Sequence, residues 1–527
     1  MWPSGPRRWA VTAVWVLGVI AVFAANLRLA RTRAVNSDGA SNALQAWDML
    51  HGNVLLHGWA LSDVSFYTTE LPQYMLVEIV RGLNQDVVHV AAAMTYTLAT
   101  LLASLLARGD AAGRQALTRV LIGAGIMLAP QLASGVNILI SSPDHIGTSV
   151  PVMVVWLILD RARRSWYVPV IAGALLGWAV VADMLVLYIG VVPLVLVCAV
   201  SIVRAVAAEH RPLTSQWYEL ALGAAALAGA AASGLALHVI HARGGFYMPA
   251  PAGHLVQDGA MFLRNLAIAG QGLLLLGGAD FLGLRGAAGA AFTVLHLASV
   301  FLAAWGTWLA ARRFLRDRDL VAQLLVTGVA LNLAAYVLSS KANVITQTRE
   351  IAAVLPFAAA LAGRLLAGRL QAAGLRLLLV VLLGYLAGLA WEISQPPVAA
   401  QNQQLATWLQ ARHLHDGLSG YWESNVVTLT SGDRVRIRAV ATSGGRLVPS
   451  LRESDAAWYD PGRDTARFVV LFPGVAGYPG FTPERAVLAT FGRPARIYHV
   501  GAYMILVWNT NLLTELARLP NTDPATE

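Results

Sequence analysis

The sequence predicts a polytopic α-helical membrane protein of about eleven spans with a C-terminal α/β domain outside the membrane. Composition predicts the membrane part, since 57% of the 527 residues are hydrophobic and only 13% are charged. Soluble domains carry roughly 25% charged residues. The external domain is predicted by a change of pattern after about residue 394, where strand-like and helix-like segments alternate as in small α/β domains.

Apolar runs of about the length that a bilayer-spanning helix needs define the expected spans. They lie near residues 9–27, 86–107, 118–134, 147–160, 166–182, 184–203, 217–241, 287–311, 320–339, 351–367 and 375–393. The first run follows Arg7 and Arg8 and could be a signal peptide. Its length favours an uncleaved first span.

Basic residues set the expected orientation. Lys and Arg exceed Asp and Glu by 38 to 29 and gather in short loops such as "RARR" (161–164) and "RRFLRDR" (312–318). The positive-inside rule makes these loops cytoplasmic, which places the N-terminus inside and the C-terminus outside the plasma membrane. The pI near 9.9 is therefore explained by basic residues in cytoplasmic loops and does not indicate binding to nucleic acid.

One apolar stretch does not fit this alternation as a span. If residues 265–283 crossed the membrane, every later loop would change side, so we expect a re-entrant or interfacial helix on the external face. The membrane domain is then residues 1–393 and the external domain residues 394–527. In the external domain, strands are expected at 426–442, 466–474 and 495–509, and helices at 402–414, 482–492 and 511–519. The single cysteine, Cys198, excludes an internal disulfide.

The first external loop, residues 28–85, is much longer than a typical connection of about 4–6 residues. Its segment "SDGASNALQAWDMLHGN" (37–53) has an apolar stripe through Ala40, Leu44 and Trp47. This predicts a helix on the membrane surface with Asp48 on its wet side. Asp38 stands at the start of the helix, where it could simply be the N-cap.

The same loop continues with "FYTTELPQY", in which Glu70 precedes Pro72 and suits the first turn of a second helix. A structural role for Glu70 beside the helix dipole is the alternative to a functional one. Asp48, Asp63 and Glu78 are expected to be solvated.

Two further external loops carry polar groups. "SSPDHIGTS" (141–149) sets Asp144 beside His145, where Ser142 or Asp144 could also be a plain helix cap. "SSKANVITQTRE" (339–350) carries Lys341 and Arg349 on the side where cations are normally scarce. They suit an anionic ligand such as a phosphate, with lipid head groups as the alternative; His254 and Arg264 could join them.

External carboxylates, cations and aromatic rings together suit a reaction at a phosphorylated sugar. A carboxylate can act as a general base or bind a divalent cation, and cations can neutralise a phosphate leaving group. The sequence contains no P-loop, no Cys/His metal motif and no nucleophile elbow.

Asp38 directly after the first span, the following amphipathic helix and "FYTTELPQY" resemble the first external loop of GT-C superfamily glycosyltransferases. "SPDHIGT" and "TREIAAVLPFAAALAGR" (348–364) are similar to later motifs of that superfamily. Bacterial enzymes of the protein mannosyltransferase and lipid A aminoarabinose transferase group look nearest. Asp38 is followed by Gly39, whereas several branches have a second acidic residue, which puts a metal at this position in doubt.

The resemblance implies a GT-C-like membrane glycosyltransferase that moves a sugar from a polyprenyl-phosphate donor to a lipid, glycan or protein acceptor on the outer face, with inversion. Asp38 and Glu70 would be catalytic. Substrate binding would fall to Tyr67, Asp144, His145, Lys341 and Arg349. No cofactor is implied with certainty, although a divalent cation (Mg²⁺ or Mn²⁺) stays open.

Two other functions fit parts of the sequence. A transporter or lipid flippase would use the same charges as a permeation site, but such sites usually lie at mid-membrane, whereas these charges gather on one face. Asp183, in a turn between two spans, is the nearest to an intramembrane candidate. A non-catalytic cell-envelope assembly protein, with the α/β domain as its binding module, is the other alternative.

Overall fold

The computed structural model describes residues 6–129, 135–143, 145–249, 253–281, 286–373, 375–398, 402–472 and 481–516. Two compact units make up the chain. The helical unit comprises Met1–Thr32, Ala92–Ala236 and Gly253–Pro397, and the mixed unit comprises Arg33–Ala91, Leu237–Ala252 and Val398–Glu527. The first external loop thus folds together with the C-terminal residues.

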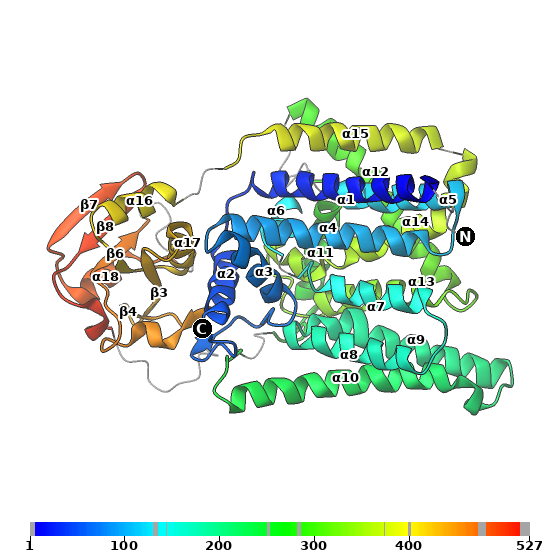
Figure 1. Ribbon diagram of the computed structural model, residues 1–527, viewed down its shortest axis with the longest axis horizontal. Helices are drawn as coiled ribbons and strands as arrows, with labels where there is room; N and C mark the ends of the chain where they lie inside the picture. Colours follow the sequence, from blue (N-terminus) through cyan, green and yellow to red (C-terminus); the bar gives the residue numbers. More distant parts are fainter. Residues whose placement is uncertain are drawn as a thin grey trace. The chain divides into compact units, whose positions relative to one another are not determined.

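The helical unit is a bundle whose long helices run roughly parallel in Figure 1. Its α-helices are α1 (Pro6–Ala30), α4 (Asp86–Arg108), α5 (Gly113–Leu128), α6 (Gly135–Leu139), α7 (Ser149–Arg161), α8 (Tyr167–Ala182), α9 (Val192–Val203), α10 (Trp217–Ala242), α11 (Gly259–Leu276), α12 (Gly286–Arg313), α13 (Leu320–Val337), α14 (Val354–Ala373) and α15 (Leu375–Ser394). Short π or 3₁₀ turns are η2 (Leu187–Val191), η3 (Arg204–Ala208), η4 (Leu213–Gln216) and η5 (Ile345–Ile351).

Eight helices in the described part of the chain are long and apolar enough to cross a membrane. The number is nine if η5 and α14, bent by 55°, form one broken span. The protein is therefore a polytopic α-helical membrane protein, as the composition predicts. Three expected spans, 118–134, 147–160 and 166–182, correspond to the shorter helices α5, α7 and α8, of 16, 13 and 16 residues. Eleven crossings stay a prediction.

The arginine-rich loops meet at one end of this bundle. Arg364 of α14 donates to Asp160 at the end of α7 (2.8 Å), to Asp319 at the start of α13 (2.6 Å) and to the carbonyl of Leu106 (2.9 Å). Arg318 likewise pairs with Glu209 at 2.6 Å. The loops that the charge pattern assigns to one side of the membrane thus lie together, and we call this the basic end.

Helix α11 covers most of the stretch expected to be re-entrant or interfacial. It is unbroken and passes the length and hydropathy test for a span. However, the Asn265 amide donates to the carbonyls of Val337 and Ser339 at the far end of α13. After its C-terminus, Gly278 lies against the Ala129 carbonyl at the far end of α5. Both of these contacts of α11 lie away from the basic end, and the interfacial or re-entrant placement of this helix stays a prediction.

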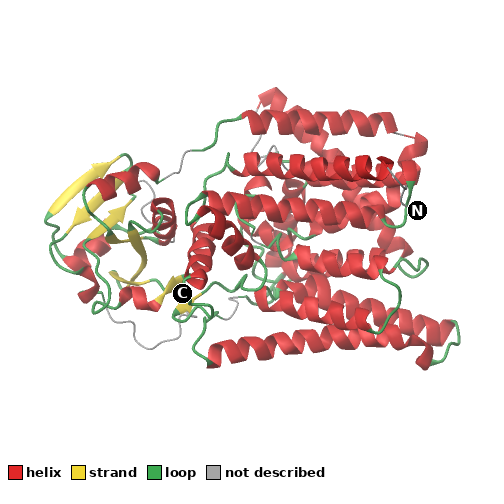
Figure 2. Ribbon diagram, viewed as in Figure 1, coloured by secondary structure: helices red, strands yellow, loops and turns green. Residues whose placement is uncertain are grey.

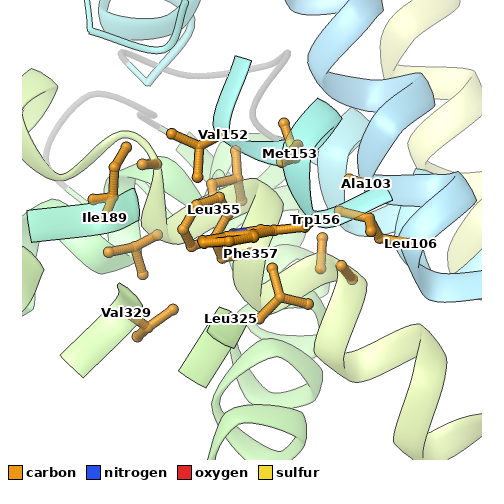
Figure 3. Close-up of a cluster of buried hydrophobic side chains, with 14 of the residues drawn as sticks. Ala103, Leu106, Val152, Met153, Trp156, Ile189, Leu325, Val329, Leu355 and Phe357 are labelled. Atoms are coloured by element: carbon orange, nitrogen blue, oxygen red, sulfur yellow. The ribbon is translucent and has the colours of Figure 1, made fainter. Parts of the chain in front are cut away.

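The centre of the helical unit is a dry, tightly packed cluster, drawn in Figure 3. Trp156 of α7 and Phe357 of α14 lie at its centre and are fully buried. Around them pack Ala103, Leu106, Val152, Met153, Ile189, Leu325, Val329 and Leu355. Because lipid is as apolar as these side chains, van der Waals packing of this kind holds membrane helices together.

Helices α8 and α10 touch through glycines. A Cβ at Gly173 would lie 2.3 Å from the Ala225 carbonyl oxygen, and one at Gly229 would lie 2.1 Å from that of Gly173. A Cβ at Gly177 would lie 2.6 Å from the carbonyl oxygen of Gly229. Small residues four apart allow two helix backbones to approach this closely.

The mixed unit contains a six-stranded sheet flanked by helices (Figure 2). Its helices are α2 (Ser37–Leu50), α3 (Glu70–Arg81), α16 (Gln403–Ala411), α17 (Tyr421–Ser431) and α18 (Glu484–Phe491), with 3₁₀ turns η6 (Ala456–Tyr459) and η8 (Leu512–Thr514). Its strands are β1 (Trp59–Ala60), β2 (Asp416–Ser419), β3 (Arg436–Ser443), β4 (Arg446–Pro449), β5 (Ser454–Asp455), β6 (Phe468–Leu471), β7 (Arg496–Val500) and β8 (Tyr503–Val507).

The strand order is β4-β3-β2-β6-β8-β7, and central β2 runs parallel to both β3 and β6. Alternate residues of β6 enter opposite layers, as the pleat dictates. Phe468 and Val470 pack with α16 and α17, whereas Val469 and Leu471 pack with α18. The predicted α/β domain is therefore a three-layer α/β/α arrangement.

Three details differ from the sequence prediction. The segment expected as one strand over 426–442 starts as helix α17 and becomes strand only in β3, because Gly432 ends the helix in the left-handed conformation. The expected strand 495–509 is the hairpin of β7 and β8. Of the expected helix 511–519, the described residues form only the short turn η8.

Candidate active site

Helix α2 is capped by Asn36, not by Asp38. The side-chain oxygen of Asn36 accepts a hydrogen bond from the Gly39 backbone N–H at 2.9 Å, which satisfies a free donor of the first turn. Asp38 is the second residue of the helix and is only 9% exposed. The capping alternative for Asp38 is therefore wrong.

The expected position of α2 on a surface is also wrong. Eleven of its residues are buried, among them the polar Ser41, Asn42 and Gln45. Asp48, expected to be solvated, accepts hydrogen bonds from the Trp59 indole (2.8 Å) and the Asn53 amide (2.7 Å). Helix α2 is thus an internal element of the mixed unit, which encloses the carboxylate of Asp38.

Asp38 meets two groups from the C-terminal part of the chain. The phenol oxygen of Tyr421 lies 2.5 Å from Asp38 Oδ1 and is also hydrogen-bonded to Glu453 Oε2. All three side chains are buried. The guanidinium of Arg452 lies over the Tyr421 ring, 5.2 Å from its centroid.

The backbone around this cluster is tied on both sides. Ser37 Oγ donates to the Tyr421 carbonyl at 2.5 Å. Strands β1 and β5 pair with Ala60 opposite Ser454, which fixes the residue next to Glu453 against the first external loop. Segments almost 400 residues apart in sequence are thereby held in one site.

Burial is the main reason that the pKa of Tyr421 is raised well above its ordinary value, and the negative charges of Glu453 and Asp38 add to it. The phenol is therefore a firm proton donor at neutral pH. A buried carboxylate held by a phenol can accept a proton from a substrate hydroxyl, which is the chemistry of a general base.

Glu70 begins α3, as the position before Pro72 predicts, and is 1% exposed. Its Oε2 accepts a hydrogen bond from the Thr69 hydroxyl. Since α3 packs against α2, Glu70 and Asp38 lie on neighbouring helices of the same unit. The phenol of Tyr67 donates to the Val54 carbonyl at 2.9 Å and its ring packs on Phe246, so Tyr67 also shapes the loop.

Glu78, on the buried face of α3, is not solvated as expected. It is 2% exposed, and neither carboxyl oxygen has a hydrogen-bond partner among the described residues. Burial raises its pKa to about 9, so Glu78 is neutral at physiological pH.

The helical unit holds a second polar cluster, away from its basic end. His145 Nδ1 lies 3.0 Å from Asp183 Oδ2, which also accepts a hydrogen bond from Thr148 Oγ1 at 2.6 Å. Asp183 Oδ1 accepts from the Leu185 backbone N–H at 2.8 Å. Asp183 is thus a buried partner of His145, a role that its place in a tight turn does not reveal.

The cluster extends to the last external loop. His145 Nε2 lies 3.8 Å from Glu350 Oε1, and the charge of Arg349 also acts on the imidazole. Burial alone would lower the pKa of His145, but Glu350 and Asp183 outweigh it and raise this pKa to about 9. The imidazole is therefore a cation at neutral pH, as its predicted partnership with a phosphate requires.

Lys341 lies half-buried in the same loop, between α13 and η5. The Ser340 backbone N–H donates to the His254 carbonyl at 2.8 Å, which joins two of the expected external loops. The structure thus brings His145 and Arg349 together and places Lys341 in the adjoining segment. Asp144 lies outside the described residues.

Metal binding has limited support in the residues present. Across the described ranges, no group of three or more His, Cys, Asp or Glu side chains is arranged to hold an ion. Asp38 and Glu453 are bridged by the Tyr421 phenol. A cation requirement stays a prediction.

Sequence reasoning missed Tyr421, Glu453, Asp183 and Glu350. Asp183 was named only as the nearest to an intramembrane candidate, and its pairing with His145 has no local signal in the sequence. Tyr421 and Glu453 carry no local signal, since only the tertiary fold brings them to Asp38.

Comparison with solved structures identifies the fold. ArnT from Cupriavidus metallidurans bound to undecaprenyl phosphate matches with a TM-score of 0.56 and 12% identity, over 95% of this chain and 98% of that chain. ArnT in the apo state matches with a TM-score of 0.57 and 13% identity, over 96% and 100%. No protein-family model and no curated protein matches the sequence. This chain is therefore a multi-pass membrane protein whose fold is similar to that of ArnT over almost the whole length of both chains.

Proposed function

We propose that this protein is a GT-C-type glycosyltransferase that moves a sugar from a polyprenyl-phosphate-linked donor to an acceptor hydroxyl on the outer face of the plasma membrane. The observation that carries the proposal is the state of Asp38. It is a buried carboxylate, directly after the first span, that caps no helix and is held by the Tyr421 phenol. The fold shared with ArnT, solved with undecaprenyl phosphate, supports a lipid-phosphate donor.

In the proposed reaction, the acceptor oxygen attacks C1 of the sugar while the C1–oxygen bond to the lipid phosphate breaks. Asp38 takes the proton of the acceptor hydroxyl, and the polyprenyl phosphate leaves with the bonding electrons. A single displacement of this kind inverts the anomeric centre. General-base assistance of this sort contributes roughly 10²- to 10⁴-fold in rate.

The leaving phosphate gains negative charge, so cations must face it. Lys341, Arg349 and protonated His145 are the proposed donors. Asp183 and Glu350 keep the imidazole charged and fix its orientation. Glu70 would orient the sugar or the acceptor, and the Tyr67 ring, packed on Phe246, would line the same loop.

The test is sugar transfer by the purified protein in nanodiscs. Radiolabelled polyprenyl-phosphate sugars serve as donors and a membrane extract as acceptor, and wild type is compared with Asp38→Asn. Asp110→Asn is the matched control, because Asp110 is exposed in the loop that precedes α5.

We expect transfer by wild type and by Asp110→Asn, and a loss of at least 10²-fold in Asp38→Asn. Transfer that survives in Asp38→Asn removes the general-base role from this residue. If wild type consumes no donor of the panel, the transferase assignment fails, and the transporter and assembly alternatives are then tested by donor flipping and by donor binding.

A further inference from the structure

We propose that Tyr421 and Glu453 complete the catalytic carboxylate, with the Tyr421 phenol donating to Asp38 and a protonated Glu453 donating to the Tyr421 phenol. Tyr421 and Glu453 of the mixed unit would then be positioning residues for the reaction. This inference rests on the proposed function, because it needs Asp38 ionised as the base.

The first argument counts protons. The phenol oxygen of Tyr421 is hydrogen-bonded to both Asp38 Oδ1 and Glu453 Oε2. A phenol carries one hydrogen, and an ionised carboxylate can only accept. One phenol hydrogen can be shared between two acceptors, as at Tyr459. Two full hydrogen bonds from a phenol oxygen to two carboxyl groups need a second proton, which one of those carboxyl groups holds. A base must be free to accept a proton, so Glu453 is the carboxyl that holds it.

The second argument concerns charge. Tyr421 is almost fully buried, and Asp38 and Glu453 are 9% and 6% exposed. Burying several like charges without compensation is costly. Among the charged groups that act on the phenol are Glu453 and Arg452, from the segment before β5, and Asp38 from α2. A protonated Glu453 removes one of the two negative charges beside the phenol.

The third argument is position. Tyr421 begins α17 directly after β2, the central strand with parallel neighbours on both sides. The carboxyl end of such a strand is the topological switch point, where α/β sheets bind ligands. At this switch point, the phenol of Tyr421 is hydrogen-bonded to the carboxylate of Asp38, from the predicted first external loop.

Backbone conformation gives independent support. Glu453 has a φ of +51°, in the left-handed region that a non-glycine residue rarely adopts. Such a conformation persists only where the surroundings impose it, and it is concentrated at functional sites. The pairing of β1 with β5 immediately after Glu453 holds the residue in this conformation.

The experiment compares four full-length proteins in nanodiscs: wild type, Tyr421→Phe, Glu453→Gln and Tyr459→Phe. Tyr459→Phe is the matched control, because its half-buried phenol lies in the same unit and donates to the backbone carbonyls of Ala439 and Ser450. The readouts are kcat, KM for the donor, the pH profile of kcat/KM and the thermal melting temperature.

We expect Tyr421→Phe to lower kcat by about 10- to 100-fold, the worth of a hydrogen bond to a charged group, with KM within about twofold. The pH profile of kcat/KM should also change, because Asp38 loses the hydrogen bond from the phenol. Glu453→Gln should stay within about threefold of wild type, because an amide imitates a protonated carboxyl. Tyr459→Phe should lower the melting temperature and leave the pH profile in place.

Unchanged kcat and pH profile in Tyr421→Phe would overturn the proposal while wild-type transfer still upheld the function. Loss of transfer in Glu453→Gln as large as in Tyr421→Phe would also overturn it, because Glu453 would then act as an anion. If wild type transfers no sugar, infrared spectroscopy decides. A protonated-carboxyl band at neutral pH that disappears in Glu453→Gln supports the shared proton, and identical spectra exclude it.

Discussion

The side-chain oxygen of Asn36 accepts a hydrogen bond from the backbone N–H of Gly39 at 2.9 Å and so completes the first turn of α2. Because Asn36 meets this requirement, the carboxylate of Asp38 is not needed as a cap and accepts a hydrogen bond from Tyr421 instead. Stability and activity should therefore depend on different residues of the same helical turn.

Asp38→Asn is expected to abolish most sugar transfer while leaving the melting temperature near that of wild type, because an asparagine oxygen can still accept from Tyr421. Asn36→Ala is expected to lower the free energy of unfolding by about 1 kcal/mol through loss of the cap and to retain transfer. Differential scanning fluorimetry and the transfer assay test both. The reverse pattern, a fragile but active Asp38→Asn, would return Asp38 to a structural role.

The pair of His145 and Asp183 should make stability depend on alkaline pH. The pKa of His145 is raised from 6.5 to about 9 in the folded protein, so its contribution is complete below pH 6.5 and disappears as the pH rises through 9. Asp183→Asn should cost roughly 3 kcal/mol at pH 7 and clearly less at pH 9.5. Melting curves across this range measure the difference. An equal cost at both pH values would show that the charged pair is not formed.

Glu78 should destabilise the protein increasingly as the pH rises. Its folded-state pKa is raised from 4.5 to about 9 by burial, so folding retains a proton that the unfolded chain releases, and stability falls between these pH values. Glu78→Gln should therefore melt higher than wild type at pH 8, with the gap closing towards pH 4.5. A gap that does not change with pH would mean that the carboxyl is ionised in the folded state.

The glycine contact of α8 with α10 predicts a sharp difference between two positions of one helix. Gly229→Ala places a methyl group 2.1 Å from the Gly173 carbonyl oxygen and should cost about 1–3 kcal/mol by overpacking. Gly223→Ala meets nothing within 4 Å and should be neutral or slightly stabilising, since alanine favours helix. Thermal melting in detergent compares them, and similar values for both variants would contradict the close packing of these helices.

Periodicity and charge predict much of this fold because they act locally. Long apolar runs define most of the bundle helices, and the loops that Arg364 and Arg318 join could be grouped by their charge alone. The segment 426–442 was predicted as strand because it is rich in valine and threonine, and helix α17 shows that packing outweighs such a preference.

The candidate site is only partly predictable for the same reason. Asp38, Glu70, His145, Lys341 and Arg349 could be proposed because each lies beside a span or at a helix start, and their roles stay proposals. The partners Tyr421, Glu453 and Asp183 come from distant elements. The hydrogen bond between Tyr421 and Asp38 joins residues 383 positions apart, and that between His145 and Asp183 joins residues 38 apart. Local sequence patterns do not predict such contacts, because they form only in the complete tertiary fold.

The bridge at Arg364 has a consequence for biosynthesis. The residue emerges from the ribosome 204 residues after Asp160 and 45 after Asp319. Until α14 has been made, α7 and α13 lack the side chain that joins their ends, so these earlier helices insert first and dock later, in the manner of two-stage assembly. A nascent chain interrupted before this point would lack the bridge between the ends of α7 and α13.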